Sequence, residues 1–268
     1  MSFSIAGKTA IITGAANGIG LAISREFAQQ GANVMMVDMD DKQLAKEVGD
    51  LPEDSSVRHF AGDLRERLTI ANLLSATMDS FDQVDILVNA SRQIMRTDPL
   101  DMDDDSISTM LNQNLMTSLR LSQAVAKRMI KQAKEDNREE GSTGAIVNMS
   151  SISACRTNPD LMGYSMATAA LDQMTRGLAT ALAPHRIRVN AVAFGSVMSA
   201  SLKNTLKEFP NYRNDIEAYT PLGRIAPPTE LVDTVRYLAS DASAFMTGQV
   251  ITVDGGRTLI DPVRSPAH

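Results

Sequence analysis

Short apolar runs rich in β-branched residues alternate with helical patterns along the whole chain. Such nearly continuous apolar runs are typical of parallel strands whose two faces are both covered by helices. Strict alternation of strand and helix predicts βαβ units, and hence an α/β fold of Rossmann-like type: a doubly wound parallel sheet flanked by helices. We predict helices near Gly20–Gln30 and from about Asp41, and strands at Thr9–Thr13, Asn33–Asp38, Val57–Ala61, Asp85–Asn89, Gly144–Ser150, Arg188–Ala193 and Gln249–Val253.

Two stretches interrupt this pattern. The charged segment Lys131–Gly144 is typical of a solvated helix end followed by a loop. The segment 198–221 is the longest irregular stretch, and it predicts either a substrate lid beside a ligand crevice or a surface excursion. Residues 1–268 show no repeat or linker. They therefore predict a single dinucleotide-binding and catalytic domain with a short C-terminal tail at 257–268.

Charge and composition narrow the class of protein. The net charge of −6, without a basic block, argues against a nucleic-acid partner. We find neither an apolar run of membrane-spanning length nor the pattern of a signal peptide at residues 1–8, and the single cysteine, Cys155, fits a reducing compartment. A cytoplasmic protein without membrane contact or metal site is therefore expected. The 16 methionines favour gap-filling in the core over an adaptable apolar pocket.

A glycine-rich turn, TGAANGIG at Thr13–Gly20, joins the first predicted strand to the first helix. Gly14 permits a tight turn, Gly18 lets the backbone approach a pyrophosphate, and Gly20 allows close packing of helix on strand. The helix N-terminus offers free N–H groups and partial positive charge to phosphates. The turn, with Asn17 and Ile19 between its glycines, therefore predicts a dinucleotide site.

Asp38 ends the second predicted strand and decides which dinucleotide is expected. A carboxylate there accepts both ribose hydroxyls of the adenosine and repels a 2′-phosphate. Neither the turn nor the residues directly after Asp38 carry a Lys or Arg that would offset this repulsion. We therefore predict NAD(H) rather than NADP(H), and set aside the alternative that Asp38 caps a loop.

The chain resembles the short-chain dehydrogenase/reductase family, whose T-G-x-x-x-G-x-G spacing it carries from Thr13 to Gly20. The match extends from about Gly7 to Gly256. Its further segments are Gly62–Leu64 (GDL), Asp85–Asn89 (DILVN), Asn112–Leu115 (NQNL), Ile146–Ser151 (IVNMSS), Ile187–Val192 (IRVNAV), Pro221–Arg224 (PLGR), Thr247–Gly248 (TG) and Val253–Gly256 (VDGG).

The resemblance implies where the rest of the cofactor lies. It places Asp63 and Leu64 against the adenine, and Asn89 with the following Ala90 at the ribose. The backbone of Val197 would meet the nicotinamide carboxamide. Ser199 stands where the family usually has Thr, and its hydroxyl would reach the same group.

The resemblance also implies a reaction centre. Ser151 ends the fifth strand, and Tyr164 follows it at the family's separation of 13 residues. Asn114 occupies the helix-bending position that holds a water relay. Tyr164 would transfer a proton to or from a carbinol oxygen that Ser151 hydrogen-bonds, while a hydride moves between the carbon and the nicotinamide.

Thr168 departs from the family at this centre, because the motif Y-x-x-x-K reads Tyr164-Ser165-Met166-Ala167-Thr168. Residues i and i+4 share one helical face, so the missing ammonium would have been beside the phenol. Thr168 supplies a hydroxyl but no charge, and a phenol needs help to lose its proton at neutral pH.

Two more departures lie nearby. Arg92 stands where the family's N-N-A-G motif has its last residue, and Phe194 replaces the proline of Pro-Gly. Arg92 or Arg156 would supply the missing charge from another direction, although a solvent-facing loop position is the expected one for each.

Three functions fit this sequence. The leading one is an NAD(H)-dependent oxidoreductase that interconverts a secondary alcohol and a ketone, with chemistry weakened or altered by Thr168. The second is a catalytically impaired NAD(H)-binding protein, either a non-catalytic subunit or a nucleotide-sensing scaffold. The third is a changed reaction, such as elimination or isomerisation, with a structural cofactor. The resemblance implies a homotetramer, built through paired helices and the last strand.

Overall fold

The computed structural model describes residues 2–49, 52 and 55–261, and its centre is a parallel sheet. The strand order is β3-β2-β1-β4-β5-β6-β7, so the order reverses between β1 and β4. That reversal creates the crevice in which doubly wound folds bind ligands. The strands are β1 (Thr9–Thr13), β2 (Asn33–Asp38), β3 (Val57–Ala61), β4 (Ile86–Asn89), β5 (Gly144–Ser151), β6 (Ile187–Phe194) and β7 (Val250–Val253).

The predicted strands and the predicted fold class are confirmed. The first three predicted strands match the observed bounds. The others differ by one residue at one end, except β6, which is one residue longer at each end. The strands could be predicted because both faces of the sheet are buried. Ile11 and Ile12 are adjacent in β1 and belong to two hydrophobic clusters on opposite faces of the sheet, and both are fully buried. The continuous apolar pattern therefore records two covered faces.

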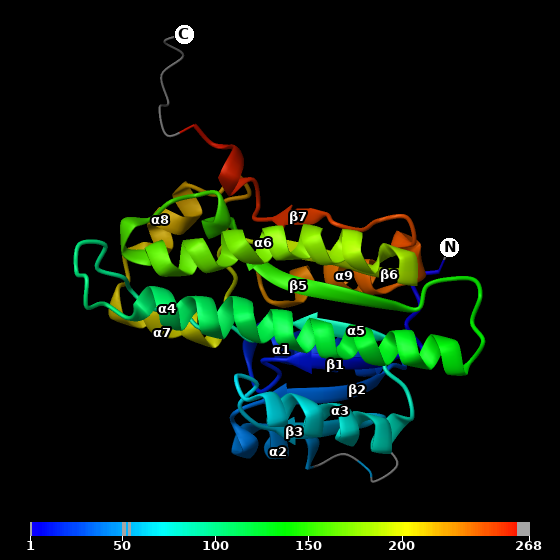
Figure 1. Cartoon of the computed structure of the whole chain (residues 1–268). Coiled ribbons are helices and arrows are strands. Elements are labelled where there is room, and N and C mark those ends of the chain that lie inside the picture. Colours follow the sequence, from blue (N-terminus) through cyan, green and yellow to red (C-terminus); the bar gives the residue numbers. More distant parts are fainter. Residues whose placement is uncertain (1, 50–51, 53–54, 262–268) are drawn as a thin grey trace.

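Helices cover both faces of the sheet (Figure 1). On one side, α1 (Gly18–Gln29), α2 (Asp41–Val48) and α9 (Thr229–Ala239) contribute Phe27, Leu44 and Val235 to the first cluster. On the other, α3 (Arg67–Phe81), α5 (Thr117–Glu135) and α6 (Met162–Leu182) contribute Leu73, Val125 and Ala179 to the second. The short α4 (Ser106–Met110) and a π-helical turn, Leu111–Met116, lead into α5.

The segment 198–221, which we expected to be irregular, forms two short helices. These are α7 (Ala200–Glu208) and α8 (Tyr212–Ala218), and they lie with α4 at one end of the sheet (Figure 1). The Ser199 hydroxyl caps α7 by accepting a hydrogen bond from the Leu202 N–H at 3.2 Å. Helices of about two turns leave too short an apolar period to be recognised, which explains the error.

Two other segments were predicted at the sequence level. The helix α5 ends at Glu135, and the residues from there to Gly144 form a loop, as the charged stretch predicted. Of the C-terminal tail, residues 257–261 include a short 3₁₀ turn at Arg257–Leu259, and 262–268 lie outside the described residues. In the described part of the chain, none of the helices has the length and apolar character needed to cross a bilayer.

Candidate active site

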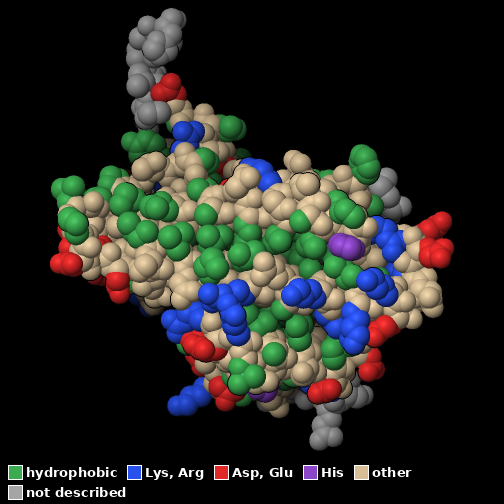
Figure 2. All heavy atoms as spheres, in the orientation of Figure 1, with side chains coloured by type: hydrophobic (Ala, Val, Ile, Leu, Met, Phe, Trp, Pro, Cys, Tyr) green, Lys and Arg blue, Asp and Glu red, His purple; other side chains and the backbone are tan. Residues whose placement is uncertain are grey.

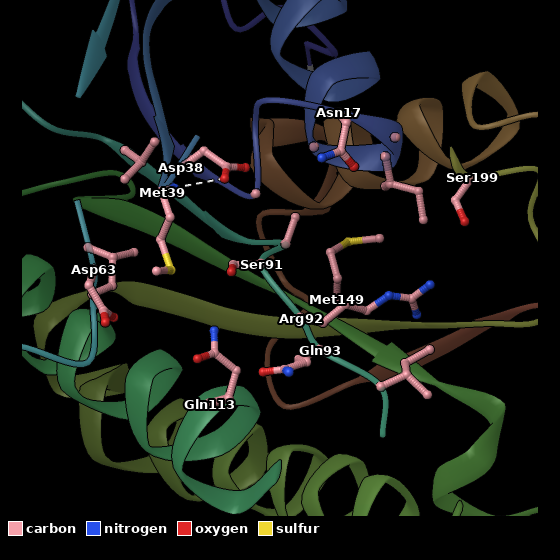
Figure 3. A pocket seen from close by; sticks show the side chains of 18 of the residues that line it. Asn17, Asp38, Met39, Asp63, Ser91, Arg92, Gln93, Gln113, Met149 and Ser199 are labelled. Atoms are coloured by element: carbon pink, nitrogen blue, oxygen red, sulfur yellow. Dashed lines mark hydrogen bonds between the residues drawn. The ribbon is translucent and has the colours of Figure 1, made fainter. Parts of the chain in front are cut away.

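A cleft of ≈ 550 Å³ lies at the switch point, beside the turn that follows β1 (Figure 3). Its size falls within the range of about 300–1,000 Å³ that small-molecule and cofactor sites occupy. The predicted cofactor residues in its wall are Gly14, Asn17, Gly18, Ile19, Gly20, Asp38, Asp63, Leu64, Ala90 and Ser199. Residues that the sequence did not single out as part of a site also line it: Met39, Arg65, Gln93, Gln113 and Met149.

The three glycines of the turn have different structural roles. Gly14 has φ 67°, and a Cβ there would be 2.9 Å from the Ser91 Cα. At Gly20 a Cβ would be 2.1 Å from the Gly14 carbonyl oxygen, so this glycine is needed for packing. At Gly18 (φ 57°) the nearest atom that a Cβ would meet is the Ser199 Cβ, at 3.8 Å across the cleft. The glycine-rich turn therefore leaves open, at Gly18, the space that a side chain would fill.

Asp38 sits at the end of β2 with its carboxylate held by backbone N–H groups. One oxygen accepts from Ala16 N–H at 3.1 Å, and the other accepts from Met39 N–H at 2.8 Å (Figure 3). These bonds fix the carboxylate against the glycine-rich turn and leave acceptor capacity for further donors. The residues present therefore fit the ribose diol of a dinucleotide.

Asp63 lines the same cleft but is already paired. The Arg65 guanidinium donates to both carboxylate oxygens, with Nε 2.9 Å from each. This hydrogen bonding by Arg65 holds the pKa of Asp63 below its ordinary value, against the opposing effect of burial. Arg65 brings to the cleft wall a cation that sequence reasoning missed, since it follows Asp63 rather than Asp38. Its charge is balanced by Asp63.

Asn89 differs from the expected ribose contact. Its side chain turns into the core, where the amide donates to Ser122 Oγ at 3.0 Å and to Asn148 Oδ1 at 2.8 Å. Asn89 is 4% exposed and is not part of the cleft wall, whereas the next residue, Ala90, is. Both faces of β4 are covered, and the Asn89 side chain lies on the face that α5 covers, since Ser122 belongs to that helix.

The predicted catalytic hydroxyls are not in the cleft wall, but each lies next to a residue that is: Tyr164 is bonded to Arg92, and Ser151 pairs in register with Phe194. Tyr164 is 3% exposed near the start of α6, and Ser151 ends β5, where its Oγ accepts from Ser153 N–H at 3.1 Å. No hydrogen bond joins the two hydroxyls in the part of the chain that the structure describes. Asn114 lies in the π-helical turn Leu111–Met116, at the predicted helix irregularity, and its amide forms a reciprocal pair with the Gln93 backbone at 2.8 and 2.9 Å.

Thr168 and Val197 are buried and use their polar groups within the protein. The Thr168 hydroxyl lies 3.0 Å from the carbonyl oxygen of Tyr164 and 3.1 Å from that of Ser165, so it donates to its own helix. It therefore makes no contact that would replace an ammonium beside the phenol. The Val197 carbonyl accepts from Ser199 N–H at 2.6 Å, and Val197 is outside the cleft wall.

Arg92 is not the solvent-facing loop residue that we expected. It is half-buried, it lines the cleft, and its Nη1 donates to the Tyr164 hydroxyl at 3.0 Å. Its guanidinium carbon also lies 4.4 Å from the centre of the Phe194 ring. Arg156 is exposed, as expected, and donates to the Thr258 carbonyl. The Arg92 contact joins residues 72 positions apart and has no local signal in the sequence.

Comparison with known proteins agrees with this geometry. The family model described as enoyl-(acyl carrier protein) reductase matches residues 14–258. A 3-oxoacyl-[acyl-carrier-protein] reductase, FabG, of Thermotoga maritima is 33% identical over 94% of this chain and 98% of its own. The oxidoreductase UcpA of Salmonella typhimurium is 30% identical over 97% of each chain.

The fold comparison gives the same result. A short-chain type dehydrogenase/reductase from Mycobacterium marinum superposes with a TM-score of 0.85 at 29% identity, covering 96% of this chain and 98% of the other. The sheet, the glycine-rich cleft and the match over most of the chain define a nicotinamide-dependent class of oxidoreductase. The chain belongs to the short-chain dehydrogenase/reductase family.

Proposed function

We propose that this protein is an NAD(H)-dependent oxidoreductase that interconverts a secondary alcohol and a ketone. The observation that carries the proposal is that one cleft is lined both by Asp38, which is anchored to the glycine-rich turn, and by Arg92, which donates to the buried hydroxyl of Tyr164. The Thermotoga relative is named for the reduction of a 3-oxoacyl group, which is carbonyl chemistry of the same kind.

Asp38 supports NAD(H) as the cofactor. Its carboxylate is anchored beside the turn, and a 2′-phosphate placed there would face an uncompensated negative charge. Arg65 is the cation at that end of the cleft, and it is engaged by Asp63 through three hydrogen bonds from its side chain. Gly18 and the N-terminus of α1 would hold the pyrophosphate.

The residues of the proposed reaction centre divide the chemistry between them. Tyr164 exchanges a proton with the alcohol or carbonyl oxygen, and Ser151 orients that oxygen by a hydrogen bond. When bound, the nicotinamide supplies the hydride exchange with the substrate carbon. Asn114 holds the Gln93 backbone, and thereby the loop that carries Arg92, against the π-helical turn that precedes α5.

The substitution Tyr164→Phe tests this proposal. We expect wild-type protein to interconvert NAD⁺ and NADH with at least one secondary alcohol or ketone, followed by nicotinamide absorbance. Positioned acid–base groups contribute about 10²–10⁴-fold, so turnover in Tyr164→Phe should fall by at least ~100-fold while NADH affinity stays within about twofold. Equal turnover in both proteins would contradict the assignment of Tyr164.

A second candidate function follows from the burial of the reaction centre. Tyr164 is 3% exposed and its hydroxyl already has a partner in Arg92. An NAD(H)-binding protein without turnover, acting as a subunit or nucleotide sensor, would show such an arrangement. Tight NADH binding, with no turnover across alcohols and ketones at any pH, would establish this second function and reject the first.

The assembly and location that we propose are those of the family resemblance: a cytoplasmic homotetramer of single-domain subunits, each with 198–221 as a substrate lid. Hydrophobic side chains spread along α6 on one face of the molecule (Figure 2). Met166 of this helix is 45% exposed. A helix pair across this face would cover it, and sedimentation equilibrium measures the oligomer directly.

A further inference from the structure

We propose that Arg92 supplies the positive charge that the family takes from the lysine of Y-x-x-x-K. The inference rests on the proposed function, since it assigns a role at the same reaction centre. Arg92 reaches the Tyr164 oxygen from the loop after β4, whereas a lysine at position 168 would reach it from within α6. The phenol thus keeps a neighbouring positive charge, but this charge comes from a loop instead of from α6.

The contact with Tyr164 is direct and lies in an apolar surrounding. Arg92 Nη1 is 3.0 Å from the phenol oxygen. The hydrophobic cluster that holds Tyr164 contains Met110 and Ala167, with Met95, Leu111 and Leu161 packed against it. Because these neighbours are neutral, Arg92 is the charged group in contact with the hydroxyl. The exposed Arg156 and Asp160 lie on the loop that precedes α6.

Phe194 holds the guanidinium in place without neutralising it. The guanidinium carbon of Arg92 is 4.4 Å from the ring centre, within the cation–π range of about 6 Å. Phe194 is 2% exposed and pairs in register with Ser151, so its ring is fixed beside the reaction centre. Among the ion pairs of the described residues, none includes Arg92.

The three departures from the family motifs thus form one physical unit. The Thr168 hydroxyl bonds to its own helix and leaves the phenol without a local cation. Arg92 occupies that role from across the cleft, and Phe194 provides the flat apolar surface on which the guanidinium lies. Arg156, the other cation considered for this role, instead donates to the Thr258 carbonyl.

In the reaction, Arg92 stabilises the deprotonated form of Tyr164. In alcohol oxidation the phenolate would take the hydroxyl proton of the substrate, and the hydride on the carbon that bears this hydroxyl would be accepted by bound NAD⁺. In ketone reduction the phenol would return the proton to the carbonyl oxygen, with the hydride supplied by bound NADH. In both directions Arg92 favours the anionic oxygen and transfers no proton itself, because a guanidinium stays protonated in proteins.

The test uses three variants of the full-length protein. Arg92→Gln keeps a hydrogen-bond donor and removes the charge. Arg92→Gln combined with Thr168→Lys moves the cation to the family's position. Arg156→Gln removes an exposed arginine from the neighbouring loop and is the matched control.

Two readouts are compared. The first is the pH profile of alcohol oxidation, and the second is the ultraviolet titration of the Tyr164 phenolate, taken as the difference from Tyr164→Phe without cofactor. For Arg92→Gln we expect turnover at neutral pH to fall ~10- to 30-fold, or ~1.4–2 kcal/mol at ~1.4 kcal/mol per tenfold. Both profiles should move to higher pH, and the double variant should restore them. Arg156→Gln should match the wild type.

Other outcomes overturn the proposal. If the pH profiles of Arg92→Gln match those of the wild type, Arg92 does not act on Tyr164, whether or not turnover changes. If, in addition, the substitution raises only KM, Arg92 is an anchor for substrate. Failure of the proposed function has a different signature: no turnover in any protein, with an unchanged NADH affinity. The phenolate titration still decides the charge effect of Arg92 in that case.

Discussion

Replacing Gly18 by alanine separates backbone strain from cofactor contact. Gly18 has φ 57°, where an alanine costs ~1–2 kcal/mol relative to a right-handed conformation, partly offset by a gain of ~0.4–1 kcal/mol from the less flexible unfolded chain. The folded protein has room for the methyl group, since its nearest neighbour is the Ser199 Cβ at 3.8 Å. We expect the free energy of unfolding to fall by only ~0.5–1 kcal/mol.

The effect of Gly18→Ala on cofactor affinity should be larger. The added methyl group stands in the space through which a pyrophosphate approaches the backbone, so it displaces the phosphates from one or more N–H groups. A hydrogen bond to a charged group is worth ~1.5–3 kcal/mol. At ~1.4 kcal/mol per tenfold, losing one such bond weakens NADH binding by about 10- to 100-fold.

Gly7→Ala is the matched control for this experiment. Gly7 has φ 74°, an alanine Cβ there would have no atom within 4 Å, and it lies before β1, outside the cleft wall. Titration of NADH fluorescence and urea unfolding would be run on both variants. Equal losses of stability, with a loss of NADH affinity in Gly18→Ala alone, would support a pyrophosphate site at Gly18. Equal NADH affinities in the two variants would mean that the pyrophosphate does not approach the backbone at Gly18.

Two further substitutions give separate tests. Asp38→Asn should weaken NADH binding by ~10-fold or more and reduce the preference for NADH over NADPH, because one charged acceptor of the ribose hydroxyls is lost. The control is Asp41→Asn, at an exposed position. An unchanged ratio of the NADH and NADPH affinities in Asp38→Asn would reject the assignment of Asp38. Burial raises the pKa of Asp85 above its ordinary value, so the native state retains this proton more tightly than the unfolded state. The free energy of unfolding that Asp85 contributes therefore falls as pH rises from the ordinary aspartate value through the raised one. Asp85→Asn retains an acceptor for the Thr9 N–H and should remove this pH-dependent loss of stability. Urea unfolding at several pH values measures it. Parallel curves of unfolding free energy against pH for variant and wild type would contradict the prediction.

Much of the fold follows from local pattern, because the parallel strands are buried on both faces. The bounds of β1, β2 and β3 could be predicted from their apolar runs and the turn residues around them. The helices α7 and α8 could not, since they are short and carry no long apolar period.

The part of the cleft wall beside the glycine-rich turn was also largely predictable. Gly14, Gly18 and Asp38 are fixed by the geometry of one turn and one strand end, and the structure places all three in the cleft wall. The core contacts of the Asn89 side chain were not predictable, because motif position says which residue ends a strand but not which way its side chain turns.

The proposed reaction centre depends on tertiary contacts. The family resemblance implies that a cation is missing at Thr168, but it cannot show that Arg92 approaches from a loop 72 residues away. The contact depends on the sheet register, which sets Phe194 beside Ser151 and brings its ring under the guanidinium. Sequence therefore identified the unusual residues, and the fold was needed to show that they meet.

A crystal structure of the protein with bound NAD(H) would show whether the cleft presents a nicotinamide to Tyr164. We predict the adenosine at Asp38, the pyrophosphate at Gly18, and the nicotinamide ring facing the Tyr164 hydroxyl with Arg92 still on Phe194. A substrate carbonyl would then fit between the ring and the hydroxyl. If the nicotinamide is instead turned away from Tyr164 by Arg92, with only the adenosine half held in the cleft, the oxidoreductase assignment is contradicted.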